Sequence, residues 1–278
     1  MTKIVKTQLI PLSLTVVTFL GLCTILYIYI NFLNLFPAKE KIIPKLQIQD
    51  VLVGFTIYIK TAIDFAILIG NLMSSNQGWK KRIAIELGTA LGNGLGTLLI
   101  LAIWYFFKEV PILMVIMIVI ASLILLRMAE ESFEGFLTEH KDFKHFHVSI
   151  SFLKQQLTII NRITKPTIGI LIPNASITNA KTMSFFSLIA FSITVPFILG
   201  LDDFAGYIPL FTIINVFGFA VGVFLGHMLL NLGLFLFPRK TVDIVKHPLV
   251  HIFGGGFFLI IAIWGIYEAI QITMTILR

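Results

Sequence analysis

Long apolar runs dominate this chain of 278 residues and limit what it can fold into. Several of them reach about twenty residues or more, the length that an α-helix needs to cross the hydrocarbon core of a bilayer. The composition agrees, since 57% of the residues are hydrophobic, only 13% are charged and the mean hydropathy is +0.96. A soluble domain carries about 25% charged residues. The sequence therefore predicts an all-α integral membrane protein whose main partner is the lipid bilayer.

The apolar runs predict seven spanning helices. An N-terminal helix and loop occupy 1–50, and the other spans form two groups of three, within 51–127 and 183–278. The polar connection 128–182 separates these groups, and its apolar residues recur at helical spacing between Phe143 and Ile163, which predicts an amphipathic helix. The seven expected spans lie near 8–36, 51–74, 83–107, 110–127, 183–211, 214–237 and 249–274.

The cations indicate how these helices are oriented. If the N-terminus is cytoplasmic, 15 Lys and Arg residues fall on the inner side and 5 on the outer side, while Lys60 lies within a span. An excess of inner cations is the usual pattern of membrane proteins. We therefore expect a multi-pass protein of the cell membrane with its N-terminus cytoplasmic and its C-terminus outside. This distribution also explains the net charge of +7, which does not indicate a nucleic-acid partner.

The two groups of three spans share a pattern of acids and glycines. The first contains TAIDFAILIG, with Asp64, and the second contains GLDDFAGYIPLF, with Asp202 and Asp203. The span after each acidic segment carries glycines at every fourth position, which places them on one helix face and lets helices approach closely in lipid. Two such three-helix units insert with opposite orientations, as in secondary transporters with inverted repeats. The glycines are Gly88, Gly92 and Gly96 in the first group and Gly218, Gly222 and Gly226 in the second.

The aspartates are the candidate site. Asp202 and Asp203 are the only charged residues between Thr182 and Pro238. A carboxylate in a span costs about 2.5–3.5 kcal/mol on insertion scales and usually faces a bundle interior or cavity, where oxygen ligands suit a hard cation. The alternative for Asp202 and Asp203 is a re-entrant turn in which they cap the next helix. The expected ion ligands are three aspartates that would hold a metal ion and two neutral amides, namely Asp64, Asp202, Asp203, Asn71 and Asn215.

Lys60 lies one helical turn before Asp64 and can modulate this site in three ways. It can neutralise Asp64 in a salt bridge, extend to the interface, or occupy the cation site when that site is empty. Two further polar residues are expected in structural positions, Glu86 near the membrane interface and His227 as a packed group that bridges helices.

Several enzyme classes lack support in this sequence. The sequence has no GxxxxGK[ST] motif, which ATP-driven pumping would need, and no HExxH or GxSxG motif of hydrolases. Asp64 and Asp202 could pair as in intramembrane aspartyl proteases, but those enzymes use Tyr-Asp and Gly-x-Gly-Asp contexts, whereas Ile63 and Leu201 precede the acids here. We therefore expect neither an enzyme nor a cofactor.

GLDDFAGYIPLF resembles the second-repeat signature of CadD-type cadmium resistance transporters, in which Gly-Asp-Asn is followed by Tyr-Ile-Pro-Leu-Phe. TAIDF is similar to their first-repeat stretch Thr-x-Ile/Val-Asp-Asp, and VKHPLVHIFGGGFFLIIAIWGIYEA to their C-terminal helix. The likeness covers 51–127 and 183–274 and implies membership of the LysE superfamily of small exporters, with TerC-like proteins more distant. It also implies that Asp64 and Asp202 take the places of family aspartates. Phe65 departs from the pattern, because it stands where the family has a second acid.

Residues and resemblance together predict a secondary active transporter. It would export a cation, such as the divalent ions of cadmium or manganese, in exchange for protons at an acidic site near the membrane midplane. Protonation of a carboxylate ligand would release the cation. The alternatives are an exporter of basic amino acids and a non-transporting membrane subunit of a larger complex. Besides lipid, the expected partners are the cation itself and further copies of this chain in a homo-oligomer.

Overall fold

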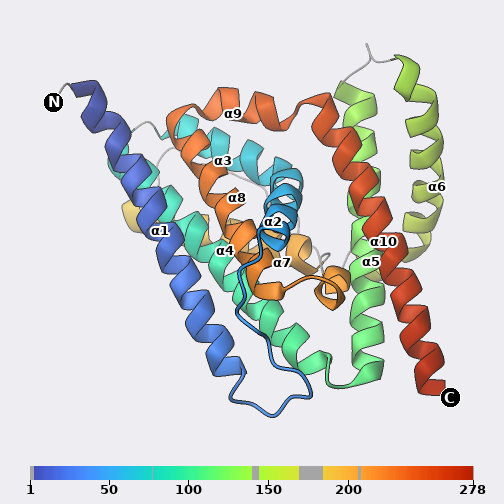
Figure 1. Ribbon diagram of the computed structural model, residues 1–278. Coiled ribbons are helices and arrows are strands. Elements are labelled where there is room, and N and C mark those ends of the chain that lie inside the picture. Colours follow the sequence, from blue (N-terminus) through green and yellow to red (C-terminus); the bar gives the residue numbers. More distant parts are fainter. Residues whose placement is uncertain (1–2, 77, 140–143, 169–183, 206–207, 278) are drawn as a thin grey trace. The chain divides into compact units, whose positions relative to one another are not determined.

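The chain is helical throughout the part that the structure describes. The computed structural model covers residues 3–76, 78–139, 144–168, 184–205 and 208–277, without the side chains at 3–8, 139, 144–145, 163–168, 195 and 198–205. The covered residues form ten α-helices and a 3-10 helix, and none of them is in a strand (Figure 1). The expected all-α class is therefore confirmed.

Five of the described helices are long and apolar enough to cross a membrane. A sixth crossing results if two consecutive helices, α2 (Ile48–Thr61) and α3 (Ile63–Ser75), make one span that is bent by 64°. A multi-pass membrane protein is thus supported, with five or six candidate spans among the described residues, whereas seven were expected. The five long helices are α1 (Lys3–Leu33), α4 (Trp79–Phe107), α5 (Pro111–Glu139), α8 (Val216–Leu236) and α10 (Pro248–Leu277).

The seventh expected span, 183–211, is not established. It corresponds to α7 (Phe185–Ala205) and the 3-10 helix η2 (Ile208–Thr212). Within α7 the apolar helix with described side chains is Phe185–Thr194, whose ten residues rise about 15 Å, half of the bilayer core. Pro196 lies inside α7, which continues to Ala205, and Pro209 lies inside the 3-10 helix η2.

The helices form two compact units. The first contains α1, α2, α3, most of α4 and α7, α8, and the short helix α9 (Pro238–Val245). The second contains the ends of α4 and α7, and α5, α6 (Lys144–Ile168), η2 and α10; the end of α7 in this unit carries Asp202 and Asp203. Each unit therefore combines segments from both halves of the chain. In residue numbers the first unit is 1–101, 175–201 and 214–245, and the second is 102–174, 202–213 and 246–278.

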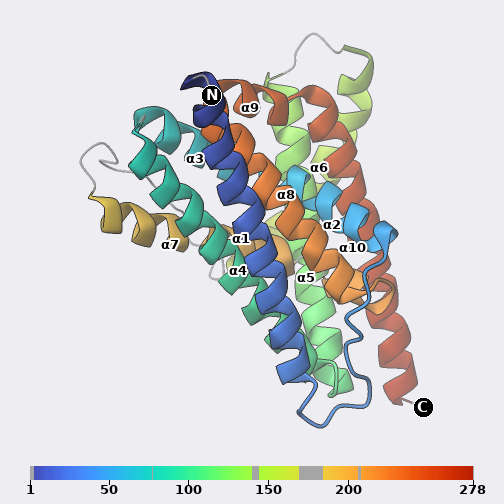
Figure 2. The same ribbon diagram turned by 60° about the vertical axis from the view of Figure 1, so that its left-hand side comes forward.

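In the first unit, the glycine face of α8 packs directly on α2. A Cβ atom at Gly222 would collide with the backbone of Val51 and Phe55, and one at Gly226 would lie 2.9 Å from the Tyr58 ring. Side chains larger than hydrogen are thus excluded where the two helices touch. Figure 2 shows α1 running beside α8 and α9 lying across the end of α8.

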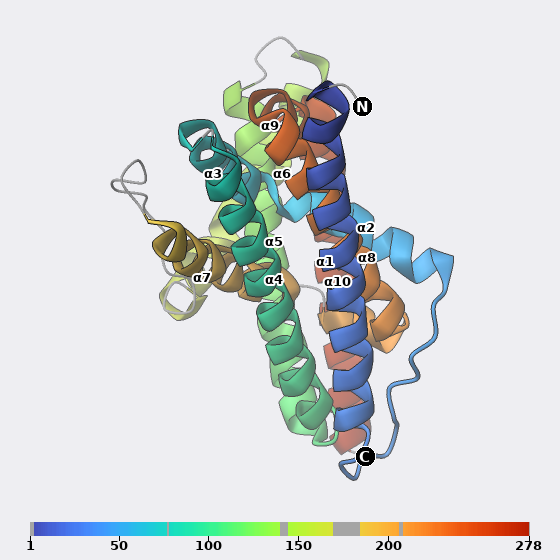
Figure 3. The ribbon, with the colours of Figure 1, turned by 90° about the vertical axis from the view of Figure 1, so that its left-hand side faces the viewer.

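The glycine face of α4 is used in the same way against α7. A Cβ atom at Gly88 would lie 2.7 Å from the carbonyl oxygen of Ile189, and one at Gly92 would collide with the backbone of Ile193. Figure 3 shows α7 crossing α4 at a steep angle. Each acidic segment therefore packs on the glycine helix of the other half of the chain, because α2 meets α8 and α7 meets α4.

In the second unit, α5 packs antiparallel to α10. Near one end of this contact, Ser132 Oγ donates a hydrogen bond to the carbonyl oxygen of His251 at 2.9 Å. Near the other end, a Cβ atom at Gly265 would collide with Ser122 Oγ. α5 thus shares a close face with α10 along both of its halves.

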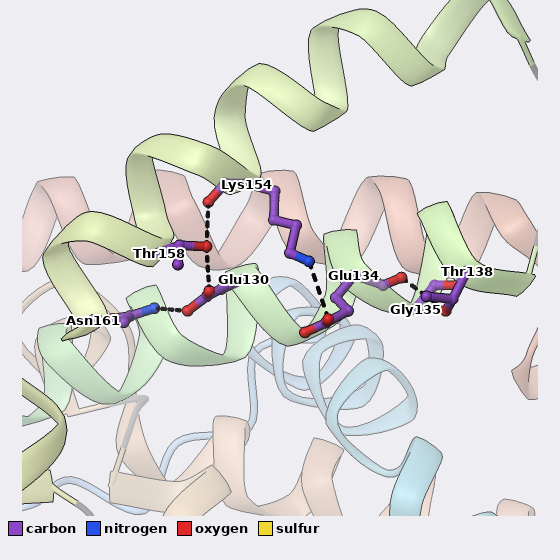
Figure 4. Close-up of polar contacts among 7 residues, drawn as sticks. All are labelled: Glu130, Glu134, Gly135, Thr138, Lys154, Thr158 and Asn161. Atoms are coloured by element: carbon purple, nitrogen blue, oxygen red, sulfur yellow. Dashed lines mark hydrogen bonds and ion pairs between the residues drawn. The ribbon is translucent and has the colours of Figure 1, made fainter.

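The polar second half of α5 binds α6 (Figure 4). Glu130 accepts hydrogen bonds from Thr158 Oγ1 at 2.5 Å and from Asn161 Nδ2 at 2.6 Å. Lys154 Nζ forms an ion pair with Glu134 Oε1 at 3.0 Å. The connection between the two groups of spans therefore contains a helix, as expected, and its polar side chains fix it to α5.

Candidate functional site

Asp64 stands directly after the break in the α2–α3 span. Ala62, between the two helices, has φ −77° and ψ 17°, and its N–H still bonds to the carbonyl oxygen of Tyr58. The first N–H groups of α3 and the last carbonyl groups of α2 have no partner within their own helices. Asp64 lies in the first turn of α3 with an exposed side chain. The break thus places a carboxylate beside the terminal backbone groups of two helices, of which the Tyr58 carbonyl oxygen is already engaged by the Ala62 N–H and by Thr61 Oγ1.

Lys60 is buried one helical turn before Asp64. Its side chain is 7% exposed, and Nζ has no hydrogen-bond partner among the described residues. Within that part of the chain no ion pair joins Lys60 to Asp64, so the neutralising salt bridge is not formed in this structure. A buried ammonium group without a partner is costly, and here it adjoins the broken segment.

The other predicted ligands have different surroundings. Asn71 is exposed on α3. Asn215 caps α8, because its side chain accepts a hydrogen bond from the N–H of Gly218 at 3.2 Å and donates one to the carbonyl oxygen of Ile43 at 2.9 Å. Both functional groups of its amide are thereby engaged in structural contacts.

Asp202 and Asp203 lie in the last turn of α7, and their side chains are outside the described part of the structure. The predicted grouping of these two carboxylates with Asp64 therefore remains a prediction. Among the residues that the structure does describe, no three His, Cys, Asp or Glu side chains are placed to hold a metal ion.

The first unit instead contains a buried polar cluster that was not predicted from the sequence. At its centre is His227 of α8, which is fully buried. Tyr58 Oη lies 2.6 Å from His227 Nδ1, and Asn231 Nδ2 lies 3.0 Å from His227 Nε2. The Phe65 ring, the residue after Asp64, packs on the imidazole at 5.2 Å between ring centroids. His227 therefore bridges α8 to both halves of the broken span.

The donors around the ring fix its tautomer. Asn231 Nδ2 also donates to Thr89 Oγ1 at 2.9 Å, and Thr89 Oγ1 donates to the carbonyl oxygen of Glu86 at 2.9 Å. Since an amide nitrogen only donates, Nε2 of His227 is the acceptor. The proton of the neutral ring then lies on Nδ1, facing the Tyr58 oxygen. A continuous set of hydrogen bonds thus runs from α4 through α8 to α2.

Glu86 is fully buried on α4. Its Oε1 accepts a hydrogen bond from Thr15 Oγ1 of α1 at 2.9 Å, while Oε2 has no partner in the described part of the chain. The residue lies about 10 Å from the start of α4 by helical rise, and its expected interfacial depth stays a prediction. Its complete burial against α1 was not expected.

Glu86 begins a line of buried polar residues that we call the α4 polar face: Glu86, Thr89, Asn93 and Thr97. Their spacing of three, four and four places them on one side of the helix. In the described structure, Asn93 Nδ2 and Thr97 Oγ1 have no hydrogen-bond partner, nor has Asn231 Oδ1 opposite Thr89. Polar groups inside a membrane protein normally bind other polar groups or water. The helical spacing of these four polar residues is visible in the sequence and could have predicted a shared face.

Asp50 is a second buried carboxylate that sequence reasoning missed. It is 6% exposed, and its Oδ2 has no hydrogen-bond partner among described atoms. It lies in the first turn of α2 beside Gly218 in the first turn of α8, and the N-termini of two helices favour a negative charge. Its place at the edge of an apolar run gave no signal of burial.

Among its described side chains, the first unit therefore carries four ionisable groups inside candidate spans, each at most 7% exposed: Asp50, Lys60, Glu86 and His227. Comparison with models of protein families, with curated proteins and with solved structures finds no match to this chain. Its function is inferred from its own residues.

Proposed function

We propose that the chain is a secondary active transporter that carries a small cation across the membrane in exchange for protons. Buried ionisable residues within apolar spans support this class, because they are expensive to insert and commonly mark ion pathways and proton relays. A purely structural membrane subunit has no such need for four of them in one unit.

The break between α2 and α3 is the observation that carries the proposal. Lipid cannot satisfy the free backbone groups at such a break, and broken spans of this kind form the ion and substrate sites of secondary transporters. At Ala62 the carbonyl groups that end α2 and the carboxylate of Asp64 offer oxygen ligands suited to a hard cation. At this break we assign Asp64 as the charged ligand and Asn71 as a neutral one. Asp202 and Asp203, which belong to the second unit, are kept as further proposed ion ligands.

Lys60 acts in this proposal as the counter-charge of the empty site. Its Nζ is buried without a partner one turn before Asp64, so a short movement of its flexible stem would bring it to the carboxylate. An arriving cation would displace the ammonium group. Cation binding and the position of Lys60 would then be mutually exclusive.

The packing of the glycine helices supports an inverted-repeat architecture. α2 rests on the glycines of α8, and α7 rests on those of α4, although each pair joins segments far apart in the chain. Packing of a helix from each half on the glycine helix of the other half is expected for two repeats related by a two-fold axis. Helices that touch through glycine alone can also slide with little steric resistance, which suits alternating access.

The cations of the first unit support the proposed orientation. Lys80, Lys81 and Arg82 begin α4, and Arg239 and Lys240 lie in α9 directly after α8. The start of α4 and the end of α8 are joined, because Arg82 Nη1 donates to the carbonyl oxygen of Phe235 at 2.5 Å. These cations thus gather at one end of the unit, which the positive-inside rule assigns to the cytoplasm.

Ligand-dependent stability of the purified protein tests the cation site. Thermal unfolding in detergent would be followed with Mn²⁺, Cd²⁺, Zn²⁺, Ca²⁺ and Co²⁺ for the wild type, Asp64→Asn, Asp202→Asn and a control, Asp243→Asn. Asp243 is exposed on α9. We expect at least one ion to stabilise the wild type and the control but neither of the other variants, since a ligand at about 100 times its Kd contributes about 2.7 kcal/mol. No stabilisation by any of these ions, with stabilisation by lysine or arginine, would favour export of basic amino acids.

A further inference from the structure

Glu86 has an unusual environment for a carboxyl group. It is wholly buried, it receives one hydrogen bond, from Thr15 Oγ1, and its Oε2 faces no donor among the described residues. A buried carboxylate that persists in proteins normally accepts several hydrogen bonds or pairs with a cation. Glu86 has neither kind of support.

The charged and titratable groups around Glu86 do not compensate it. Arg82, one turn earlier on α4, donates instead to the end of α8. On α8 the nearest titratable group is His227, whose ring is saturated by its two hydrogen bonds as the neutral tautomer. The helices that flank this part of α4 offer hydroxyl groups, Thr15 from α1 and Ser192 from α7. No side chain that the structure describes on these two helices is charged, and Lys3, Lys6, Asp202 and Asp203 lie outside the described side chains. These surroundings favour the protonated carboxyl group of Glu86 over the carboxylate.

We propose that Glu86 is the proton-carrying carboxyl group of the transport cycle, distinct from the cation ligands at the α2–α3 break. This inference rests on the proposed function. In each cycle the O–H bond at Glu86 Oε2 breaks and the proton passes to a water molecule, which leaves as hydronium on one side of the membrane. On the other side hydronium returns a proton to the carboxylate, so charge and atoms balance.

The α4 polar face supplies a path for this proton. Thr89, Asn93 and Thr97 extend from Glu86 along α4 over about 16 Å by helical rise, roughly half the hydrocarbon core. Two of these three side chains have a buried polar atom that no described residue engages. These atoms can hold the water molecules that conduct a proton.

The hydrogen bonds between the helices connect Glu86 to the cation site. Thr89, which bonds to the Glu86 carbonyl group, is linked through Asn231 and His227 to Tyr58. Tyr58 lies two residues before Lys60 on α2. A shift of α4 that accompanies the loss or gain of the proton would therefore reach the broken span through bonds that are buried in the same unit.

Two transport assays separate the roles of Glu86 and Asp64. Wild type, Glu86→Gln, Asp64→Asn and Glu131→Gln would be reconstituted into vesicles, and cation flux would be measured both under an imposed pH gradient and as exchange of labelled for unlabelled cation without a gradient. The probe is the divalent ion that stabilises the wild type. Glu131 is an exposed residue of α5 and serves as the matched control.

The expected pattern differs between the variants. Glu86→Gln should lose the gradient-driven flux at least tenfold while retaining exchange within about twofold, and Asp64→Asn should lose both. If Glu86→Gln retains gradient-driven flux, the assignment of the proton to Glu86 is wrong while the transporter proposal stands. If Glu86→Gln loses both activities to the same extent, Glu86 is a structural or ligand residue and the assignment is again wrong.

An infrared measurement tests the inference without any transport. The carbonyl stretch of a protonated carboxylic acid would be recorded at neutral pH for the wild type, Glu86→Gln and Glu86→Asp. We expect a band that is absent in Glu86→Gln and shifted in Glu86→Asp, and that responds to H₂O/D₂O exchange. Absence of any difference between the wild type and Glu86→Gln would show that Glu86 is ionised and would overturn the inference. If the wild-type protein transports no cation, the proposed function is wrong. The infrared band would still show whether Glu86 is protonated.

Discussion

Tyr58 Oη lies 2.6 Å from His227 Nδ1, so the first half of the broken span is hydrogen-bonded to the centre of α8. His227 is fully buried, and both of its ring nitrogens are occupied. Because the bond is buried, water cannot replace it when one partner is removed. The contact therefore fixes the position of α2 directly before the break at which we place the cation.

Removal of this bond should loosen α2 by a measurable amount. Tyr58→Phe keeps the ring and deletes the hydroxyl group. We expect a loss of about 0.6 kcal/mol, the average for hydrogen bonds within membrane bundles, and at most about 1.7 kcal/mol. His227→Ala should cost about 2–4 kcal/mol, since it also leaves Asn231 unpaired and opens a cavity. Unfolding of both variants and the double variant in mixed micelles would give the coupling energy. Strictly additive losses would contradict the bond.

Gly222 should tolerate no side chain. A Cβ atom there would meet the backbone of Val51, which cannot move aside as a side chain can. We expect Gly222→Ala to lower the stability by about 1–3 kcal/mol, as overpacking does. Gly21→Ala on α1 is the control, because no atom lies within 4 Å of its new methyl group. Equal thermal midpoints for the two variants would refute the close packing of α2 on α8.

Glu130 should hold α6 more firmly than Glu134. Both oxygens of Glu130 accept buried or half-buried hydrogen bonds, from Thr158 and Asn161, whereas Glu134 makes an exposed ion pair with Lys154. Exposed pairs contribute about 0–1 kcal/mol. Glu130→Ala should therefore accelerate amide hydrogen exchange in α6 clearly, and Glu134→Ala only slightly. The reverse order would contradict the arrangement in Figure 4.

Labelling of single cysteines tests the orientation of the spans. In a Cys23→Ser background, Lys80→Cys and Lys240→Cys should react with a membrane-impermeant maleimide only from the cytoplasmic side, and Lys39→Cys only from outside. All three positions are exposed. Native Cys23 lies within the apolar part of α1 and should react little from either side. Labelling of Lys80→Cys and Lys240→Cys from opposite sides would contradict the shared end of α4 and α8.

Much of the helical architecture follows from the sequence, because long apolar runs have few alternatives in a membrane. The spacing of Gly88, Gly92, Gly218 and Gly222 predicted faces of close approach, and each of these glycines lies against another helix. The identity of the partner helices could not be predicted. That choice depends on shape over the whole unit, which residue spacing does not contain.

The site was harder to predict, and the reasons are local. TAID contains neither Gly nor Pro, so the break at Ala62 had no sequence signal. Glu86 is buried only because α1 brings Thr15 beside it, a contact between residues 71 positions apart. Asn215 looked like an ion ligand because it follows the acidic segment, but its amide is used to cap α8. Asn is among the residues strongly preferred at helix N-caps.

Flux of the stabilising cation into sealed vesicles tests the central claim most directly. Purified wild-type protein, Asp64→Asn and the exposed control Asp243→Asn would be reconstituted, and uptake would be followed with a trapped indicator while the pH gradient is set, abolished and reversed. We expect the wild type and Asp243→Asn to carry the cation against the proton gradient, the flux to reverse when the gradient is reversed, and Asp64→Asn to be inactive. Flux that ignores the pH gradient, or that Asp64→Asn retains in full, would contradict proton-coupled transport at the α2–α3 break.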